Sequence, residues 1–277
     1  MNKSMAYSVH PIGAVLTRAL EMLKSERWFP EGEKQIQILE QIKQILAKDY
    51  DDLQMETMTS YSHDEINGFL ARHGFDIRLD AFPNGEFGVA SVLKIIMTWI
   101  ESQRTSINAK NDQIYQGVKM IENIRLLNSP YCEGYIVEIQ SKEGFNIYLV
   151  DVPSYPRDEQ ELFSWASKMA KSKSDNVSSE LKSVSFPEVE MDCRPDISWL
   201  LGMSAGEYFI SQALMQTKFK LDITGAKAEA AAAIALRKGI SFGELNLVFN
   251  KPFMVWIEKP GISMPVFVSW CDYDSWK

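Results

Sequence analysis

In residues 225–242 (GAKAEAAAAIALRKGISF), small alanines alternate with Lys227 and Glu229, and the run ends in basic and bulky side chains. In an extended chain, one parity of this run turns only methyl groups to one side: Ala226, Ala228, Ala230 and Ala232. The other parity begins with Lys227, Glu229 and Ala231. Such a strand could enter an existing sheet, because its inward side chains need little space and its charged ones stay in water. Propensity alone favours a helix, so the local sequence leaves helix and strand open.

A β-strand and a second strand behind a turn are predicted after this run. Residues 246–257 (NLVFNKPFMVWI) are rich in aromatic and β-branched side chains, with one proline near the start. Residues 264–270 follow a turn at Lys259, Pro260 and Gly261. The chain is therefore expected to end in a hairpin.

A single domain, residues 1–277, is the economical interpretation of the whole chain. Its 277 residues are 45% hydrophobic, enough for one large core, and no linker rich in Pro, Gly or Ser divides them. The net charge of −8 argues against nucleic-acid and anionic-membrane partners, because both attract clustered lysine and arginine. The first twenty residues show no secretory signal, so a cytoplasmic location is expected, with export by a signal-independent route left open.

Residues 202–206 (GMSAG) match the G-x-S-x-G pattern that exposes a nucleophilic serine in α/β-hydrolases. That fold orders its triad serine, acid, histidine, whereas all three histidines of this chain precede Ser204. The Ser204 hydroxyl is expected instead to cap a helix over residues 205–215. No enzymatic activity is predicted.

No cofactor or metal site is predicted either. The sequence lacks the G-x-G-x-x-G, G-x-x-x-x-G-K-[ST], H-E-x-x-H and C-x-x-C patterns. Cys132, Cys193 and Cys271 form an odd, widely spaced set, which is typical of reduced, buried thiols rather than a disulfide framework or a zinc site.

Residues 249–253 (FNKPF) match a strand of the serpin family, in which an alanine-rich hinge and an exposed reactive loop precede F-N-K-P-F and a closing hairpin. Five more segments resemble serpin blocks in order and spacing: residues 118–121 (VKMI), 135–140 (YIVEIQ), 145–153 (FNIYLVDVP), 184–190 (VSFPEVE) and 196–203 (DISWLLGM). The resemblance covers roughly the C-terminal three quarters of the chain, residues 64–277.

The N-terminal part is less similar to serpins. Residues 8–23 resemble an early buried helix, residues 64–78 the amphipathic helix across the main sheet, and residues 90–100 a long strand of that sheet. Only about forty residues separate the first two segments, where serpins have several helices and two strands. Residues 1–63 are thus a compressed helical part, and one edge of the main sheet is expected to be absent or rebuilt.

The resemblance implies an α+β fold of large mixed and antiparallel sheets with helices packed around them, and an exposed reactive-centre loop over residues 225–245. It implies a hinge that enters the main sheet after a protease cuts the loop: Gly225, Ala226, Lys227, Ala228, Glu229, Ala230, Ala231 and Ala232. It implies a protease-binding segment: Arg237, Lys238, Gly239, Ile240, Ser241 and Phe242. Counting from Gly225 places the cut bond after Gly239, and counting back from Phe249 places it after Ser241.

Two functions are compatible with these features. One is a monomeric suicide inhibitor of a serine or cysteine protease, which the alanine parity favours. The other is a serpin-fold binding protein that no longer inhibits, which the shortened N-terminal part favours because lost strands or helices would remove the strain that drives insertion.

Overall fold

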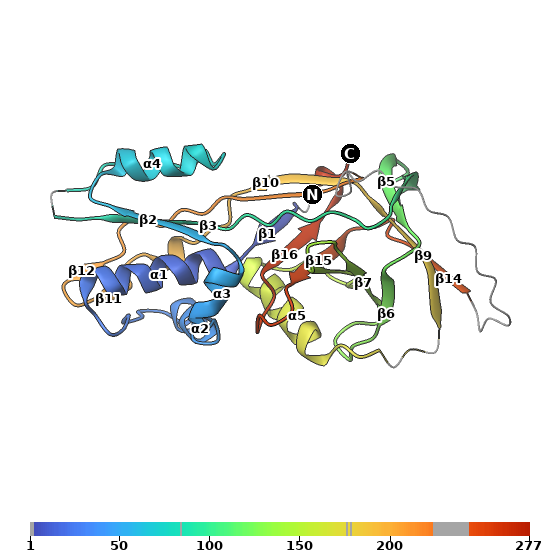
Figure 1. The fold of residues 1–277 in the computed structure, drawn as a ribbon, viewed down its shortest axis with the longest axis horizontal. Coiled ribbons are helices and arrows are strands. Elements are labelled where there is room, and N and C mark those ends of the chain that lie inside the picture. The colour runs from blue at the N-terminus through green and yellow to red at the C-terminus, as the bar shows by residue number, and fades with distance from the viewer. Residues whose placement is uncertain (1–2, 84, 176, 178, 224–243) are drawn as a thin grey trace.

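The structure is a computed structural model that describes residues 3–83, 85–175, 177, 179–223 and 244–277. Within these residues, helices and strands form an elongated α+β body in which the strands make one six-stranded, one four-stranded and three two-stranded sheets (Figure 1). The predicted α+β class is therefore confirmed.

The six-stranded sheet runs through the centre of the core. Its order is β1-β16-β15-β8-β7-β6, with antiparallel neighbours throughout. Its central strands are continuous apolar runs because both faces of the sheet are covered. The strands are β1 (Met5–Tyr7), β6 (Ile124–Leu127), β7 (Ile136–Gln140), β8 (Asn146–Val150), β15 (Phe253–Glu258) and β16 (Phe267–Cys271).

The four-stranded sheet has the order β14-β9-β5-β4, and β14 is parallel to β9. Its strands are β4 (Gln103–Asn108), β5 (Ile114–Met120), β9 (Glu180–Pro187) and β14 (Glu244–Val248). The prediction of one strand over residues 246–257 is wrong, because β14 and β15 belong to different sheets. Pro252, which has no N–H to give to a ladder, lies in the link between them.

Two of the two-stranded sheets lie side by side and are described together as the divided sheet. One half pairs β2 (Glu56–Ser60) with β3 (Gly88–Val92), and the other pairs β10 (Val189–Cys193) with β13 (Thr217–Leu221); both pairs are antiparallel. The predicted strand over 90–100 begins at Gly88 and ends at Val92. Residues 184–190, which resemble a strand segment of the serpin family, are divided at Glu188, where the chain leaves β9 and enters β10.

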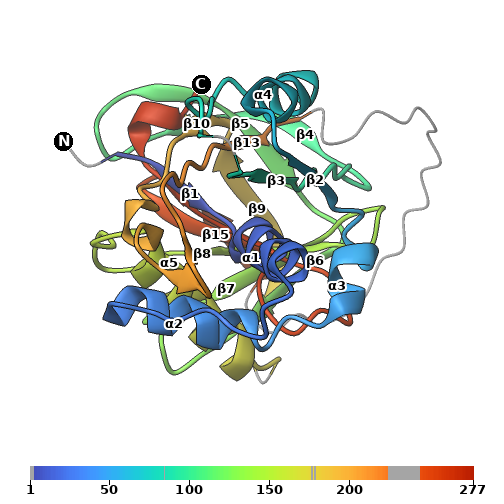
Figure 2. The ribbon, with the colours of Figure 1, turned by 90° about the vertical axis from the view of Figure 1, so that its left-hand side faces the viewer.

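Helices cover both faces of the β2–β3 half. The amphipathic pattern of residues 8–23 gives α1 (Val9–Leu23), as predicted, and α1 lies between β3 and the six-stranded sheet (Figure 2). On the opposite face, α4 (His63–Arg72) packs across β2 and β3. The predicted helix over 64–78 is shorter because Gly74, at φ 84°, turns the chain out of the helix.

The remaining helical elements of the described chain are four helices or helical turns of ten residues or fewer and one longer helix, α5, which packs on the six-stranded sheet. The stretch between α1 and α4 contains two helices besides β2. The helices are α2 (Glu33–Ile42), α3 (Ala47–Asp52), α5 (Glu159–Ser172) and the 3₁₀ turns η1 (Ser198–Leu200) and η2 (Tyr273–Ser275).

The helix predicted over residues 205–215 is wrong. Ser204 begins β11 (Ser204–Ala205), which forms a hairpin with β12 (Tyr208–Phe209). Backbone bonds to Phe29 on the other side of β11 and the left-handed φ of 62° at Gly206 fix this extended course. The Ser204 hydroxyl therefore caps no helix.

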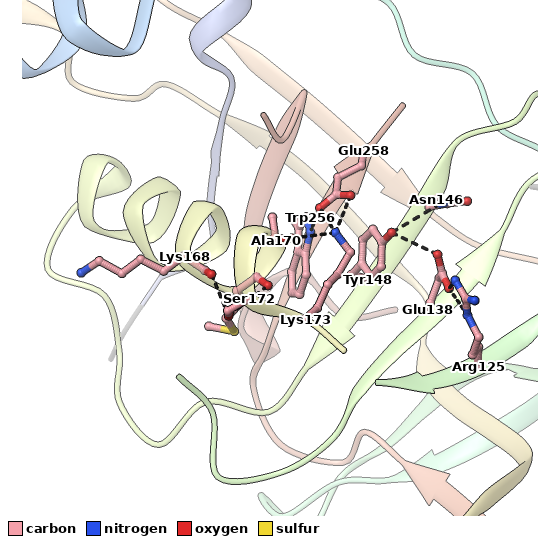
Figure 3. A network of polar contacts seen from close by, with 11 residues as sticks. Arg125, Glu138, Asn146, Tyr148, Lys168, Ala170, Ser172, Lys173, Trp256 and Glu258 are labelled. Atoms are coloured by element: carbon pink, nitrogen blue, oxygen red, sulfur yellow. Dashed lines mark hydrogen bonds and ion pairs between the residues drawn. The ribbon is translucent and has the colours of Figure 1, made fainter. Parts of the chain in front are cut away.

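A buried polar network stabilises the six-stranded sheet (Figure 3). The carboxylate of Glu138 on β7 is 1% exposed, and it accepts hydrogen bonds from Arg125 Nε at 2.5 Å and from the Tyr148 hydroxyl at 3.0 Å. Burial, followed by the neighbouring Glu258 and Glu138 carboxylates, raises the pKa of Tyr148, so its hydroxyl stays protonated and donates.

A second part of this network ties the end of α5 to β15. Trp256 stacks on Tyr148 with 4.8 Å between ring centroids, and its indole N–H donates to Glu258 at 2.9 Å. The Lys173 ammonium donates to both oxygens of the same carboxylate, at 2.9 and 2.8 Å. Every charge in the network is matched by an opposite charge or a donor, so we interpret it as a structural cluster.

Candidate functional site: a groove in the divided sheet

A groove of about 1310 Å³ separates the two halves of the divided sheet. One wall is β3 with residues 93–99, and the other is residues 207–222, which include β13. The floor comes from α1, which contributes Ile12, Val15 and Leu16. Within the described residues, β3 pairs only with β2 and β13 only with β10, so two strand edges face each other without a strand between them.

The β13 wall of the groove has a polar outer side and an apolar inner side. On β13, Thr217, Phe219 and Leu221 are buried, whereas Lys218 and Lys220 are exposed. This strict alternation is typical of a strand with one face in the core. A strand that fits between β3 and β13 therefore needs inward side chains that pack against α1 and outward side chains that tolerate water.

At one end of the groove, the two walls meet. The indole N–H of Trp99 donates to the backbone oxygen of Asp222 at 2.7 Å, and the Trp99 side chain is 2% exposed. The amide of Ile223 donates to Glu188 at 3.4 Å. The chain thus leaves β13 at the point where the divided sheet closes.

The predicted hinge and protease-binding residues, 225–232 and 237–242, all lie in residues 224–243, outside the described part of the chain. Their placement stays a prediction. The structure describes the residues on either side. β13 ends at Leu221 beside the groove, and the chain resumes at Glu244 as the start of β14, at the edge of the four-stranded sheet.

Two features of the groove were missed from the sequence. The β13 strand has a clear period-two pattern, TKFKL, that could have been found. Gln212 and Gln216 contact the segment after α4 and were not singled out; Gln212 lies in the stretch 205–215 that was assigned to a helix, and Gln216 directly follows it. Glutamine has no sequence signal that distinguishes such a contact from solvent exposure.

Other chemistry in the described residues is sparse. No group of three or more His, Cys, Asp or Glu side chains there could hold a metal ion. All three cysteines are free; Cys271 is buried, while Cys132 and Cys193 are only half-buried, contrary to expectation. Burial raises the pKa of the Cys271 thiol to about 12 and that of Cys193 to about 11, so neither is a ready nucleophile. No helix of the described chain is long and apolar enough to cross a membrane.

No protein-family model matches this sequence, and no curated protein sequence does. Solved structures do match. Serpin48 of the insect Tenebrio molitor, a highly specific serpin, is 12% identical over 98% of this chain and 92% of its own, with a TM-score of 0.60. The mouse protein-Z dependent protease inhibitor is 12% identical over 98% and 91%, with a TM-score of 0.59. Thyroxine-binding globulin in complex with thyroxine is 11% identical over 97% and 92%, with a TM-score of 0.56.

At sequence identities this low, the structural matches establish the fold alone, and the function has to be argued from the site. Two of the three similar proteins are by name a serpin and a protease inhibitor, and the third binds thyroxine. The match extends along nearly all of the chain, including the N-terminal part in which the sequence resemblance is weak. The chain has the serpin fold.

Proposed function

We propose that this chain inhibits a serine or cysteine protease by offering residues 225–245 for cleavage and then inserting the freed hinge into the groove. The single observation that supports this function is the groove itself, because it lies next to the end of β13, between two strand edges that are unpaired within the described residues. Loop insertion into the main sheet is an established property of serpins. The chain performs no catalysis of its own.

The chemical step belongs to the target protease. Its serine or cysteine attacks one peptide bond of the loop, the bond to the following nitrogen breaks, and the new carboxyl group stays on the protease as an ester or thioester. The hinge is then free at one end and can enter the groove with the protease attached. Movement of the protease across the molecule before hydrolysis of this acyl bond would make the complex permanent.

The hinge sequence suits the groove in side-chain size and charge. Inward alanines would meet the apolar floor from α1, and outward Lys227 and Glu229 would share a face with Lys218 and Lys220 of β13. The fourteen residues from Ala226 to Gly239 would span roughly 45 Å at about 3.3 Å each. A strand paired on both sides would add many ladder bonds at about 1 kcal/mol each, a gain on the order of 10 kcal/mol.

A serpin-fold binding protein that does not insert is the second candidate. It is favoured by one specific observation, the half of the divided sheet that carries β3. In the described chain this half has only two strands, β2 and β3. A wall this narrow would supply less strain to drive insertion, and the protein would then be cleaved as an ordinary substrate.

A pair of neighbouring arginine substitutions distinguishes the two functions. Ala230→Arg would place a large charge on the inward face, whereas Ala231→Arg would place the same charge in water. With a panel of serine and cysteine proteases, we expect the wild type and Ala231→Arg to form an SDS-resistant complex, and Ala230→Arg and Ala226→Arg to be cleaved without forming one. An unchanged complex in the two inward variants would overturn the insertion mechanism, and no complex with the wild type would favour the binding protein.

A further inference from the structure

Three aromatic side chains form a row that ends at β12, at the end of the molecule where β11 and β12 lie (Figure 1). The centroid of the Phe87 ring is 6.1 Å from that of Tyr61 and 6.2 Å from that of Tyr208. These three side chains are called the aromatic row below. Because Phe87 directly precedes β3 and Tyr208 lies on β12, the row crosses from one wall of the groove to the other.

The two outer rings of the aromatic row are open to solvent. Tyr61 is 67% exposed and Tyr208 is 46% exposed, whereas Phe87 is half-buried against the apolar cluster around α1. Large apolar side chains that gather on an exposed surface are typical of an interaction site. Tyrosine suits such a site because its ring offers a large contact area and loses little conformational entropy when a partner covers it.

The charges that line the groove are matched by ion pairs except near the aromatic row. Three pairs lie elsewhere along the groove: Lys218 with Asp192 at 3.3 Å, Lys220 with Asp222 at 2.6 Å and Lys277 with Glu190 at 3.3 Å. The other charged lining residues, Arg78, Glu86 and Glu207, form no ion pair within the described chain. Glu86 adjoins Phe87 and Glu207 adjoins Tyr208 in the sequence. Two carboxylates against one guanidinium leave this end of the groove with an excess of negative charge.

A neighbouring exposed ring, Phe29, holds a cation of the chain itself. The guanidinium carbon of Arg27 lies over the Phe29 ring, 4.6 Å from its centroid. Phe29 exchanges backbone hydrogen bonds with Ser204, and Ser204 pairs with Phe209 of β12. The face of an aromatic ring attracts a cation because the ring quadrupole is negative there. The rings at this end of the molecule are thus placed to bind guanidinium groups.

The spacing of the aromatic row fits an extended peptide. Side chains at alternate positions of a strand point to the same side and lie about 6.6 Å apart. This distance is close to the 6.1 and 6.2 Å between neighbouring rings of the row. Arginine is the side chain that suits these rings best, because its planar guanidinium stacks on a ring while its N–H groups donate to a carboxylate.

We propose that the aromatic row, with Glu86 and Glu207 beside it, binds an extended segment of a partner protein that carries arginines at alternate positions. The guanidinium groups stack on the exposed rings of Tyr61 and Tyr208, and the two carboxylates accept hydrogen bonds from them. This site does not depend on loop insertion, so its test and the protease test can fail separately.

The test uses the full chain and a labelled peptide, Arg-Gly-Arg-Gly-Arg, whose binding is followed by fluorescence anisotropy at low salt. A control peptide has citrulline in place of each arginine, which keeps the planar shape and removes the charge. We expect the arginine peptide to bind the wild type and the citrulline peptide not to bind. Tyr61→Leu and Tyr208→Leu should each weaken binding about two- to fivefold, the loss of one exposed cation–π contact. Glu86→Gln combined with Glu207→Gln should weaken it by a similar factor.

Two matched variants separate the rings from their surroundings. Tyr208→Phe keeps the ring and should bind like the wild type. Tyr131→Leu removes a tyrosine that is 58% exposed but does not line the groove, and it should also bind like the wild type. Melting temperatures check that each variant is folded.

Three results would overturn the proposed site. The first is failure of the wild type to bind the arginine peptide, and the second is equal binding of the citrulline peptide. The third is wild-type affinity in both Tyr61→Leu and Tyr208→Leu, or an equal loss in Tyr131→Leu, because the peptide would then bind the acidic surface without using the aromatic row.

Discussion

The six-stranded sheet and the divided sheet differ in how fully their strands are paired. In the six-stranded sheet, the four inner strands are paired on both sides, both faces of the sheet are covered, and even the buried carboxylate of Glu138 has two donors. In the divided sheet, β3 and β13 each have one neighbour in the described chain, and the Thr217 hydroxyl is buried beside the groove without a hydrogen-bond partner. The six-stranded sheet, called the complete sheet below, is continuous, whereas the divided sheet is interrupted by a groove between two strand edges that are unpaired in the described chain.

This difference indicates where the stability of the molecule lies. The complete sheet supplies the cooperative core, so its disruption should unfold the whole domain. The divided sheet can gain stability by accepting another strand, which is what a protein held above a more stable inserted form requires. Substitutions in the two regions should therefore have effects of different size and sign.

The largest loss of stability, measured as the free energy of unfolding, is expected from Trp256→Ala in the complete sheet. Trp256 is fully buried and stacked on Tyr148, and truncating such a side chain typically costs about 3–5 kcal/mol. The control is Phe209→Ala, which truncates a 65% exposed aromatic side chain on β12 and should change stability by less than about 0.5 kcal/mol. Urea unfolding of both variants measures the two values, and similar losses would contradict the assignment of the core.

An acid-dependent effect is expected from His10 in the first turn of α1, the helix between the two sheets. Burial lowers the pKa of His10 to about 4, so below about pH 6.5 the unfolded chain binds a proton that the folded protein does not. Stability should fall between about pH 6.5 and 4, by roughly 3 kcal/mol in total.

His10→Leu should abolish this part of the acid dependence, because leucine does not titrate. The measurement is the free energy of unfolding of wild type and variant at pH 7 and pH 4. A wild-type slope in His10→Leu would show that His10 is charged or hydrogen-bonded in the folded state.

The smallest effect is expected in the groove, with the opposite sign. Thr217→Val removes a buried hydroxyl that has no partner in the described chain, so it should stabilise the uncleaved protein by about 1 kcal/mol. Thr98→Val is the matched control, because the Thr98 hydroxyl donates to Glu143 at 2.6 Å and its loss should destabilise. A decrease in melting temperature for both variants would mean that Thr217 has a partner after all.

The regular helices and strands could be predicted from the sequence, whereas the links and hairpins between them could not. The amphipathic pattern of α1 and the apolar strands β7, β8 and β16 could be predicted because burial dictates their side chains. The link at Asn250–Pro252 was mistaken for part of a strand because runs of strand formers lie on both sides of it. The hairpin at Ser204 was mistaken for a helix start because long-range pairing with Phe29 overrides local capping.

The candidate site was predictable to a different degree. The alternation of alanines identifies a strand that fits a narrow space, but only the structure shows a groove of matching position, since its walls come from segments more than a hundred residues apart. The backbone of residues 75–80 is held in place by the side-chain amides of Asn67, Gln212 and Gln216, and no local sequence pattern predicts such contacts.

Melting of the protein before and after a single cut in residues 237–242 tests the central claim most directly. If the groove accepts the freed hinge, the added ladder bonds should raise the melting temperature by more than about 20 °C in the wild type and in Ala231→Arg, and not in Ala230→Arg. An unchanged or lowered melting temperature of the cut wild type would contradict insertion.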